Sequence, residues 1–175
     1  ELKSLERHDI IKRLGLDRTE AQIDRWRSLM QRVDSIPDTL RIGVAGKYVE
    51  LQDAYKSIYE ALRHGAIANN VHLEIDRIDS EQLTAENVAE RLGDLAGILI
   101  PGGFGQRGIE GKLHAAQYAR ENGVPYFGIC LGMQCALIEF ARNVCKLEGA
   151  NSREFDEDTP YPVVDLLATQ KTITT

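Results

Sequence analysis

Apolar and polar positions follow two different periods along most of this chain, and the changes between them predict its elements. From Arg41 onward, short apolar runs typical of buried strands alternate with stretches in which apolar residues recur every three or four positions, as in helices. The predicted strands are 41–45, 71–75, 95–100, 126–129 and 163–168, and the predicted helices are 53–69, 84–92, 110–122 and 133–145. Strands joined by helices predict an α/β fold with an open, mostly parallel sheet and helices on both faces.

The first forty residues have a different pattern, with two short apolar faces that predict two helices. The apolar positions of the first are Leu5, Ile10, Ile11 and Leu14. Those of the second are Ile23, Trp26, Met30 and Val33. Gly15 ends the first helix, Thr19 can cap the second, and Pro37 ends it. This charged segment carries no chemistry of its own. We therefore predict a helical interdomain linker at 1–40 and one domain at 41–175.

Composition narrows the class of protein. A chain of 175 residues is long enough for one α/β domain with a core and a modest appendage. The formal net charge of −6, without a basic stripe, argues against nucleic-acid binding. No apolar run has membrane-spanning length, and the first residues have no signal-peptide layout. Cys130, Cys135 and Cys145 are an odd number without metal spacing, so we expect a reducing, cytoplasmic location, with Cys135 and Cys145 as core residues.

Residues 128–132, Gly-Ile-Cys-Leu-Gly, join a predicted strand to a predicted helix. A sharp turn at this junction is a nucleophile elbow, here with the sulfur of Cys130 instead of a hydroxyl. The flanking Gly128 and Gly132 relieve crowding in such a turn. The helix N-terminus favours thiolate over thiol, and its N–H groups can hold an oxyanion. The alternative is a buried cysteine between two packing glycines, but the strand and helix on either side favour the nucleophile.

A glycine-rich loop at 101–108 follows another predicted strand. Its Gly103-x-Gly105-x-x-Gly108 spacing formally matches a dinucleotide fingerprint, but it does not follow the first strand and lacks the acidic residue that binds ribose. The carboxyl ends of parallel strands meet at one edge of a sheet, so we expect this loop to face the elbow. The N–H groups of Gly103 and Leu131 would then converge on an oxyanion. A plain strand-to-helix turn is the alternative.

Other features give weaker signals. Lys47 follows a glycine after the first predicted strand, but Tyr48 stands where a phosphate loop needs Ser or Thr. The histidines, which have no metal spacing and follow no predicted strand, are His8, His64, His72 and His114. Glu154 begins an acidic stretch, and such stretches are usually solvated surface, so by itself it favours no functional role.

Together these stretches resemble the class I (triad-type) glutamine amidotransferase family and, within it, the glutaminase domain of the CTP synthase family. The matching segments are 46–51, 53–55, 61–64, 101–108, 128–134, 138–143 and 150–155. The most specific are Gly-Lys-Tyr-Val-Glu-Leu at 46–51 and Pro-Gly-Gly-Phe-Gly-Gln-Arg-Gly at 101–108. The resemblance runs from about Arg41 to the end, implies a flavodoxin-like fold, and matches 1–40 to the family's interdomain linker.

The resemblance implies that Cys130 attacks the side-chain amide of L-glutamine, giving a γ-glutamyl thioester and ammonia, before water releases glutamate. It implies that Gly103 and Leu131 contact the oxyanion and that Glu154 is suited to bind the α-ammonium group of glutamine. The glutamine-binding positions that it implies are Gly103, Phe104, Leu131, Gly132, Met133, Gln134 and Glu154. It implies no cofactor in this domain and no metal at the site.

In the family, the ammonia passes to an ATP- and Mg²⁺-dependent synthetase domain of the same polypeptide that aminates UTP. GTP activates the family's enzymes, which are homotetramers. This sequence departs from that pattern, because it has no synthetase domain and reaches Thr175 before the family's His-x-Glu pair. We therefore expect a truncated glutaminase domain that is inactive alone. The alternatives are a cysteine hydrolase of a related elbow-bearing fold and a non-catalytic module that binds a synthetase.

Overall fold

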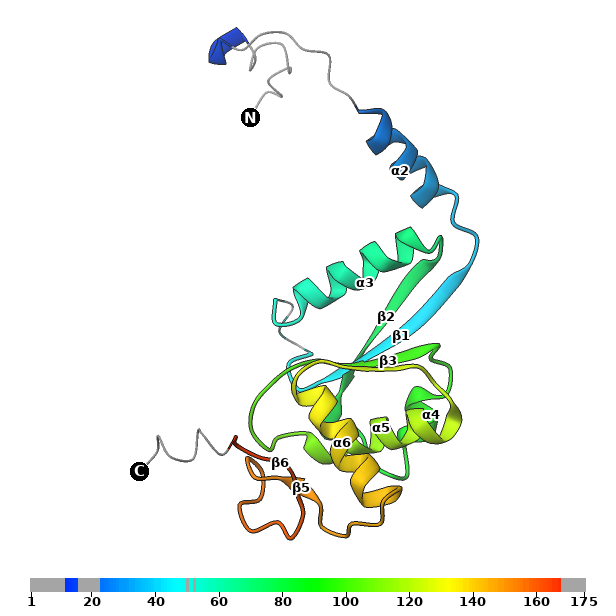
Figure 1. Ribbon diagram of the computed structural model, residues 1–175. Coiled ribbons are helices and arrows are strands. Elements are labelled where there is room, and N and C mark those ends of the chain that lie inside the picture. The colour runs from blue at the N-terminus through cyan, green and yellow to red at the C-terminus, as the bar shows by residue number, and fades with distance from the viewer. Residues whose placement is uncertain (1–11, 16–22, 50, 52, 168–175) are drawn as a thin grey trace. The chain divides into compact units, whose positions relative to one another are not determined.

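The computed structural model describes residues 12–15, 23–49, 51 and 53–167, which divide into two compact units between Ser35 and Ile36. The first unit contains helix α2 (Asp24–Asp34). The second contains, in order, β1 (Thr39–Gly46), α3 (Lys56–Ala68), β2 (His72–Asp79), the 3₁₀ turn η1 (Ser80–Gln82), α4 (Val88–Leu92), β3 (Gly97–Ile100), α5 (Ile109–Asn122), β4 (Tyr126–Gly128), α6 (Leu131–Asn143), β5 (Asn151–Ser152) and β6 (Pro162–Val164) (Figure 1).

The main sheet is parallel throughout, with the strand order β2-β1-β3-β4. Ile42 of β1 pairs with Gly97 of β3, and Ile100 at the end of β3 pairs with Gly128 at the end of β4. The loops that follow β1, β3 and β4 therefore leave the same edge of the sheet, as the alternation of strands and helices predicted. We call this edge the carboxyl edge.

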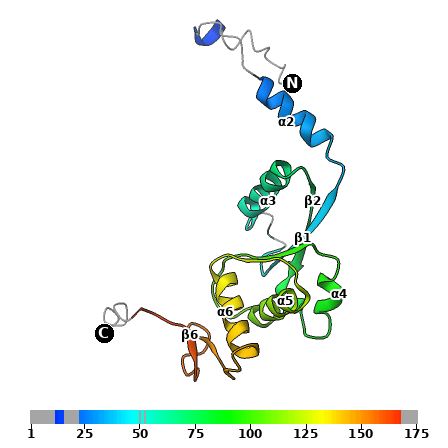
Figure 2. The same ribbon diagram turned by 45° about the vertical axis from the view of Figure 1, so that its right-hand side comes forward.

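Helices cover both faces of the sheet, with α3 on one side and α4, α5 and α6 on the other (Figures 1 and 2). Successive strand residues point to opposite faces. The buried residues on the α3 face are Val44, Tyr55, Tyr59 and Leu99. Those on the other face are Ala45, Ile78, Leu83, Leu92, Leu95, Ile98, Ile100, Ala115 and Ala119. The predicted α/β fold, with a parallel sheet and helices on both faces, is confirmed.

Several predicted elements differ from those found, and the strand expected at 163–168 is the shorter β6, in a separate two-stranded sheet. The helix expected at 84–92 is shortened to α4, because the Asn87 side chain holds a turn before it: its oxygen accepts from Thr84 N–H at 2.9 Å and its amide donates to Gln82 O at 2.8 Å. The segment at 151–160, where no strand or helix was predicted, contains β5, which pairs in parallel with β6. A two-residue strand is too short to show any periodicity.

The segment before the sheet is described only in part. Helix α2 exposes Trp26 and Met30 and has no buried residue. Thr19, the predicted cap, lies outside the described residues, and the division at 1–40 and 41–175 stays a prediction. Among the helices that the structure describes, none is long and apolar enough to cross a membrane.

Candidate active site

Cys130 occupies the turn between β4 and α6 in a backbone conformation that side chains rarely adopt. It is the N-cap residue of α6, with φ 52° and ψ −105°. A positive φ is unfavourable for a residue with a Cβ atom and persists only where the surrounding structure enforces it. The residue is exposed, whereas Leu131 beside it is buried. The turn therefore presents the thiol at the carboxyl edge of the sheet.

The glycines on either side allow the helix to approach the strands this closely. A Cβ atom built on Gly128 would lie 2.5 Å from the nitrogen of Met133, and one on Gly132 would overlap the carbonyl oxygen of Ile100. Both backbone polar groups of Gly132 have partners: its N–H donates to Ile129 O at 2.9 Å, and its carbonyl accepts from the Tyr126 hydroxyl at 2.6 Å. Gly132 thus fixes the packing of the turn.

The glycine loop after β3 lies against the elbow. A Cβ atom built on Gly102 would lie 3.5 Å from Cβ of Cys130, and one on Gly103 would lie 3.5 Å from Cδ2 of Leu131. Leu131 begins α6, and the first N–H groups of a helix have no intrahelical partner. The structure therefore brings together the three residues from which the sequence predicts a nucleophile and an oxyanion site.

Two cations that the site prediction left out hold this loop from the β1 side. Lys47 Nζ donates to the carbonyl of Phe104, whose own side chain is exposed. Arg107 donates to Lys47 O at 3.0 Å and pairs with Glu81, and both cations lie over the ring of Tyr48. The sequence could have indicated this contact only through the topology, because the loops that follow the neighbouring strands β1 and β3 must meet.

The turn after β5 holds the loop from the opposite side. Gly105 N–H donates to Oε1 of Glu154 at 3.1 Å, and the side-chain amide of Gln106 donates to Phe155 O at 2.5 Å. Phe155 packs against a buried cluster that includes Leu131. Glu154, which had only the resemblance in its favour, is thus joined by the loop to the Cys130 region.

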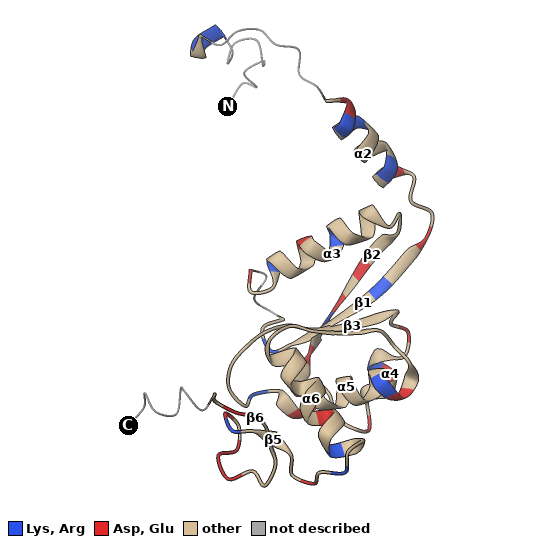
Figure 3. Ribbon diagram, in the orientation of Figure 1, with Lys and Arg blue, Asp and Glu red and all other residues tan. Residues whose placement is uncertain are grey.

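A cleft of about 820 Å³ opens beside this turn. Its lining residues are Gln134, Ser152, Arg153, Glu154, Glu157, Asp158, Val164, Asp165 and Leu166. Gln134 is one helical turn beyond Cys130, to whose carbonyl its N–H donates at 3.1 Å, and its side-chain oxygen is buried without a protein partner. Acidic residues are concentrated in the β5–β6 segment (Figure 3). Buried acceptors need donors, so the cleft suits a ligand with a cationic amine. Exposed Met133 lies beside Gln134 in the first turn of α6.

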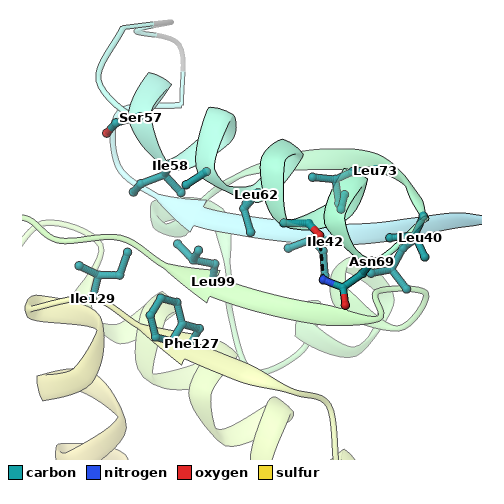
Figure 4. A pocket seen from close by; sticks show the side chains of 14 residues that line it. Leu40, Ile42, Ser57, Ile58, Leu62, Asn69, Leu73, Leu99, Phe127 and Ile129 are labelled. Carbon is teal, nitrogen blue, oxygen red and sulfur yellow. Dashed lines mark hydrogen bonds between the residues drawn. The ribbon is translucent and has the colours of Figure 1, made fainter. Parts of the chain in front are cut away.

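A second hollow, of about 610 Å³, lies between α3 and the sheet (Figure 4). Leu62, Leu99 and Phe127 are among the apolar side chains around it. Its polar side chains are those of Ser57 and Asn69, and the Asn69 amide donates to its own helix. This groove offers a packing surface and no reactive group, so the candidate site is the one at the carboxyl edge.

The three cysteines lie in different environments. Cys130 and Cys145 are exposed, and Cys135 is buried. Burial raises the pKa of the Cys135 thiol to about 11. The expectation of a core position is therefore confirmed for Cys135 and wrong for Cys145, because α6 ends at Asn143 and leaves Cys145 beyond the packed helix.

No described histidine is on a loop at the carboxyl edge. His64 is exposed within α3, His72 is the first residue of β2 and thus lies at the opposite edge, and His114 is within α5. His8 lies outside the described residues. Groups of three or more side chains able to hold a metal ion are likewise absent from the part of the chain that the structure describes.

Comparison with known proteins agrees with this geometry. The profile of a family described as "Glutamine amidotransferase class-I" matches residues 50–170. CTP synthases of Clostridium acetobutylicum and Methanocaldococcus jannaschii are 53% and 55% identical over 94% of this chain, which spans 31% and 32% of their lengths. A solved structure described as the Trypanosoma brucei CTPS glutaminase domain with bound acivicin is 43% identical. It matches with a TM-score of 0.70 over 74% of this chain and 51% of that one.

The family match covers well over half of the chain and includes the elbow, the glycine loop and the Glu154 turn. The resemblance predicted from the sequence motifs is therefore confirmed. This chain belongs to the class-I glutamine amidotransferase family.

Proposed function

We propose that this chain is the glutamine-hydrolysing part of a CTP synthase. In this role Cys130 cleaves the side-chain amide of glutamine, and the ammonia goes to the amination of UTP. The observation that carries the proposal is the strained, exposed Cys130 at the start of α6, with the Gly102–Gly103 segment packed against it. The similarity of 94% of the chain to CTP synthases supports the choice among amidotransferases.

The chemistry begins when the Cys130 thiolate attacks the side-chain carbonyl carbon of glutamine. The carbonyl oxygen becomes an oxyanion, which the N–H groups of Gly103 and Leu131 stabilise. The carbon–nitrogen bond then breaks as the nitrogen takes up a proton, so that ammonia leaves and a γ-glutamyl thioester remains. Attack by water on the thioester gives glutamate and returns the thiol.

The other end of glutamine fits the cleft beside α6. Its α-ammonium group would bind the Glu154 carboxylate and the side-chain oxygen of Gln134, which is buried without a protein partner. Phe104 and Met133, both exposed at the mouth of the site, would flank the chain of the substrate. Gly132 contributes by letting α6 approach β3 closely enough to hold Cys130 in position.

Turnover also needs a group that takes the thiol proton and delivers it to the leaving nitrogen. None of the described histidines follows a strand at the carboxyl edge. We therefore infer that residues 1–175 alone hydrolyse glutamine slowly, although Cys130 can still be captured by a glutamine-like electrophile such as acivicin. The ATP- and Mg²⁺-dependent ligation, the activation by GTP, the homotetramer and the cytoplasmic location belong to the same proposal for a polypeptide that also carries a synthetase domain.

The test uses such a polypeptide with Cys130→Ala. Because the thiol serves only amide cleavage, glutamine-dependent CTP formation should fall by about three orders of magnitude or more, while ammonia-dependent formation is retained. Cys145→Ala, at an exposed cysteine outside the elbow, is the matched control and should keep both activities. Loss of both activities in a folded Cys130→Ala protein would contradict the proposal.

A further inference from the structure

Two neighbouring residues of the glycine loop are tied to two neighbouring residues of the turn after β5. Gly105 N–H reaches the carboxylate of Glu154, and the Gln106 amide reaches the carbonyl of Phe155 at 2.5 Å. These two bonds join segments 49 positions apart in the sequence. One segment carries the proposed oxyanion donor Gly103, and the other carries the proposed ligand for the amino end of glutamine.

The turn itself is rigid. Ser152 is buried, and its hydroxyl accepts from Glu154 N–H at 3.2 Å. The Ser152 carbonyl accepts from the N–H groups of Phe155 and Asp156, at 3.0 Å each. Phe155 packs against the buried cluster that contains Leu131. The turn therefore forms a fixed support to which the loop can be held.

The glycine loop has little internal support beyond the bond from Ile109 N–H to Gln106 O at 3.2 Å. Phe104 and Gly105 are exposed, and Gly105 has a φ of 75°, a conformation that glycine adopts readily. Lys47 and Arg107 hold the loop toward β1 and η1. Gln106 is the loop side chain that extends the other way, toward Phe155. Its bond thus fixes the distance between the two halves of the glutamine site.

From this geometry, and resting on the function proposed above, we propose that Gln106 is a positioning residue. By locking the glycine loop to the Glu154 turn, it sets the affinity of the Cys130 site for glutamine without touching the substrate. The Gly105–Glu154 bond alone does not hold the glycine loop to the turn, because the carboxylate of Glu154 must also bind the α-ammonium group. The Phe155 carbonyl does not bind the substrate. Gln106 keeps the loop in register when Glu154 turns to its ligand.

The experiment measures alkylation of Cys130 by iodoacetamide in the chain, followed by mass spectrometry, over a range of L-glutamine concentrations. Gln106→Leu removes the donor at similar size, and Gln106→Arg retains an N–H donor. Gln117→Leu is the matched control, because the Gln117 amide donates to Glu121 at 3.0 Å on the surface of α5, outside the loop. Thermal unfolding of each variant checks that the fold is intact.

Gln106→Leu should raise the glutamine concentration that gives half protection by about threefold to tenfold, the loss of one net hydrogen bond. Its alkylation rate without glutamine should be unchanged, since the elbow does not depend on Gln106. Gln106→Arg and Gln117→Leu should behave like the unchanged chain. The positioning role is overturned if Gln106→Leu and the unchanged chain need the same glutamine concentration for half protection of Cys130. It is also overturned if Gln106→Leu and Gln106→Arg raise that concentration equally. Neither result contradicts the proposed glutamine site itself. Absence of protection in the unchanged chain overturns the proposed glutamine site and this inference with it.

Discussion

Replacing Gly132 by alanine tests how tightly the elbow is packed. Alanine in a helix is ordinarily more favourable than glycine by about 0.5–1 kcal/mol. At this position, however, the added Cβ would overlap the carbonyl oxygen of Ile100 and lie 3.0 Å from its carbonyl carbon and its Cβ. Ile100 is fully buried at the end of β3, between β1 and β4, so its backbone has no free space into which to move. Forced overpacking of this kind costs about 1–3 kcal/mol, which reverses the sign expected from helix propensity.

For a chain of this length, that loss should lower the thermal midpoint by roughly 2–12 °C. Thermal and urea unfolding followed by circular dichroism would measure it. Gly65→Ala is the matched control, because Gly65 is also within a helix, α3, and a Cβ there meets nothing within 4 Å. The control should gain about 0.5–1 kcal/mol. If both variants gained stability, the close approach of α6 to β3 would be refuted.

Three further predictions concern the chain as a whole. Purified residues 1–175 should show glutaminase turnover about three orders of magnitude or more below that of an intact CTP synthase, measured by glutamate release, and comparable rates would contradict the inference that none of the described histidines serves Cys130 as a base. Arg120→Met should lower the free energy of unfolding by about 2–3 kcal/mol in urea titrations, because it removes the cation from the buried carboxylate of Glu139, to which the Asn143 amide still donates; an unchanged midpoint would refute this. Lys112→Met should raise the free energy of unfolding near neutral pH, because desolvation lowers the pKa of this buried amine below 10.5. As the pH rises toward 10.5, the Lys112 amine loses its proton in the folded chain at a lower pH than in the unfolded chain. The gain in the free energy of unfolding from Lys112→Met should therefore shrink, and a growing gain would be the contrary result.

The sequence predicted the central strand β3 well because this strand is buried along its whole length. All four residues of β3 are buried, and such a continuous apolar run is a strong local signal. The signal for the elbow was equally local, since a cysteine between two glycines at a strand–helix junction can be recognised in five consecutive residues. Both signals come from short-range periodicity and sterics, which a single sequence carries directly.

The supports of the site were harder to predict because they join distant segments. Gln106 and Phe155 are 49 positions apart, and the bond between them depends on how two loops meet. Glu154 sits in a stretch whose acidic composition suggests only solvation. Cys145 was misassigned because helical periodicity continues past Asn143, whereas the chain leaves the helix there and reaches a positive φ at Lys146. Tertiary contacts override the local pattern at Gln106 and Glu154, whereas at Cys145 the local end of the helix does so.

We propose that Cys130 is a nucleophile in a site for glutamine. Limited iodoacetamide treatment of the chain near neutral pH, followed by mass-spectrometric mapping of all three cysteines, tests it most directly. We expect Cys130, exposed at the start of α6, to be labelled faster than exposed Cys145 and much faster than buried Cys135. We further expect L-glutamine to slow labelling at Cys130 alone. Equal labelling of the three cysteines, or labelling of Cys130 that glutamine leaves unchanged, would contradict it.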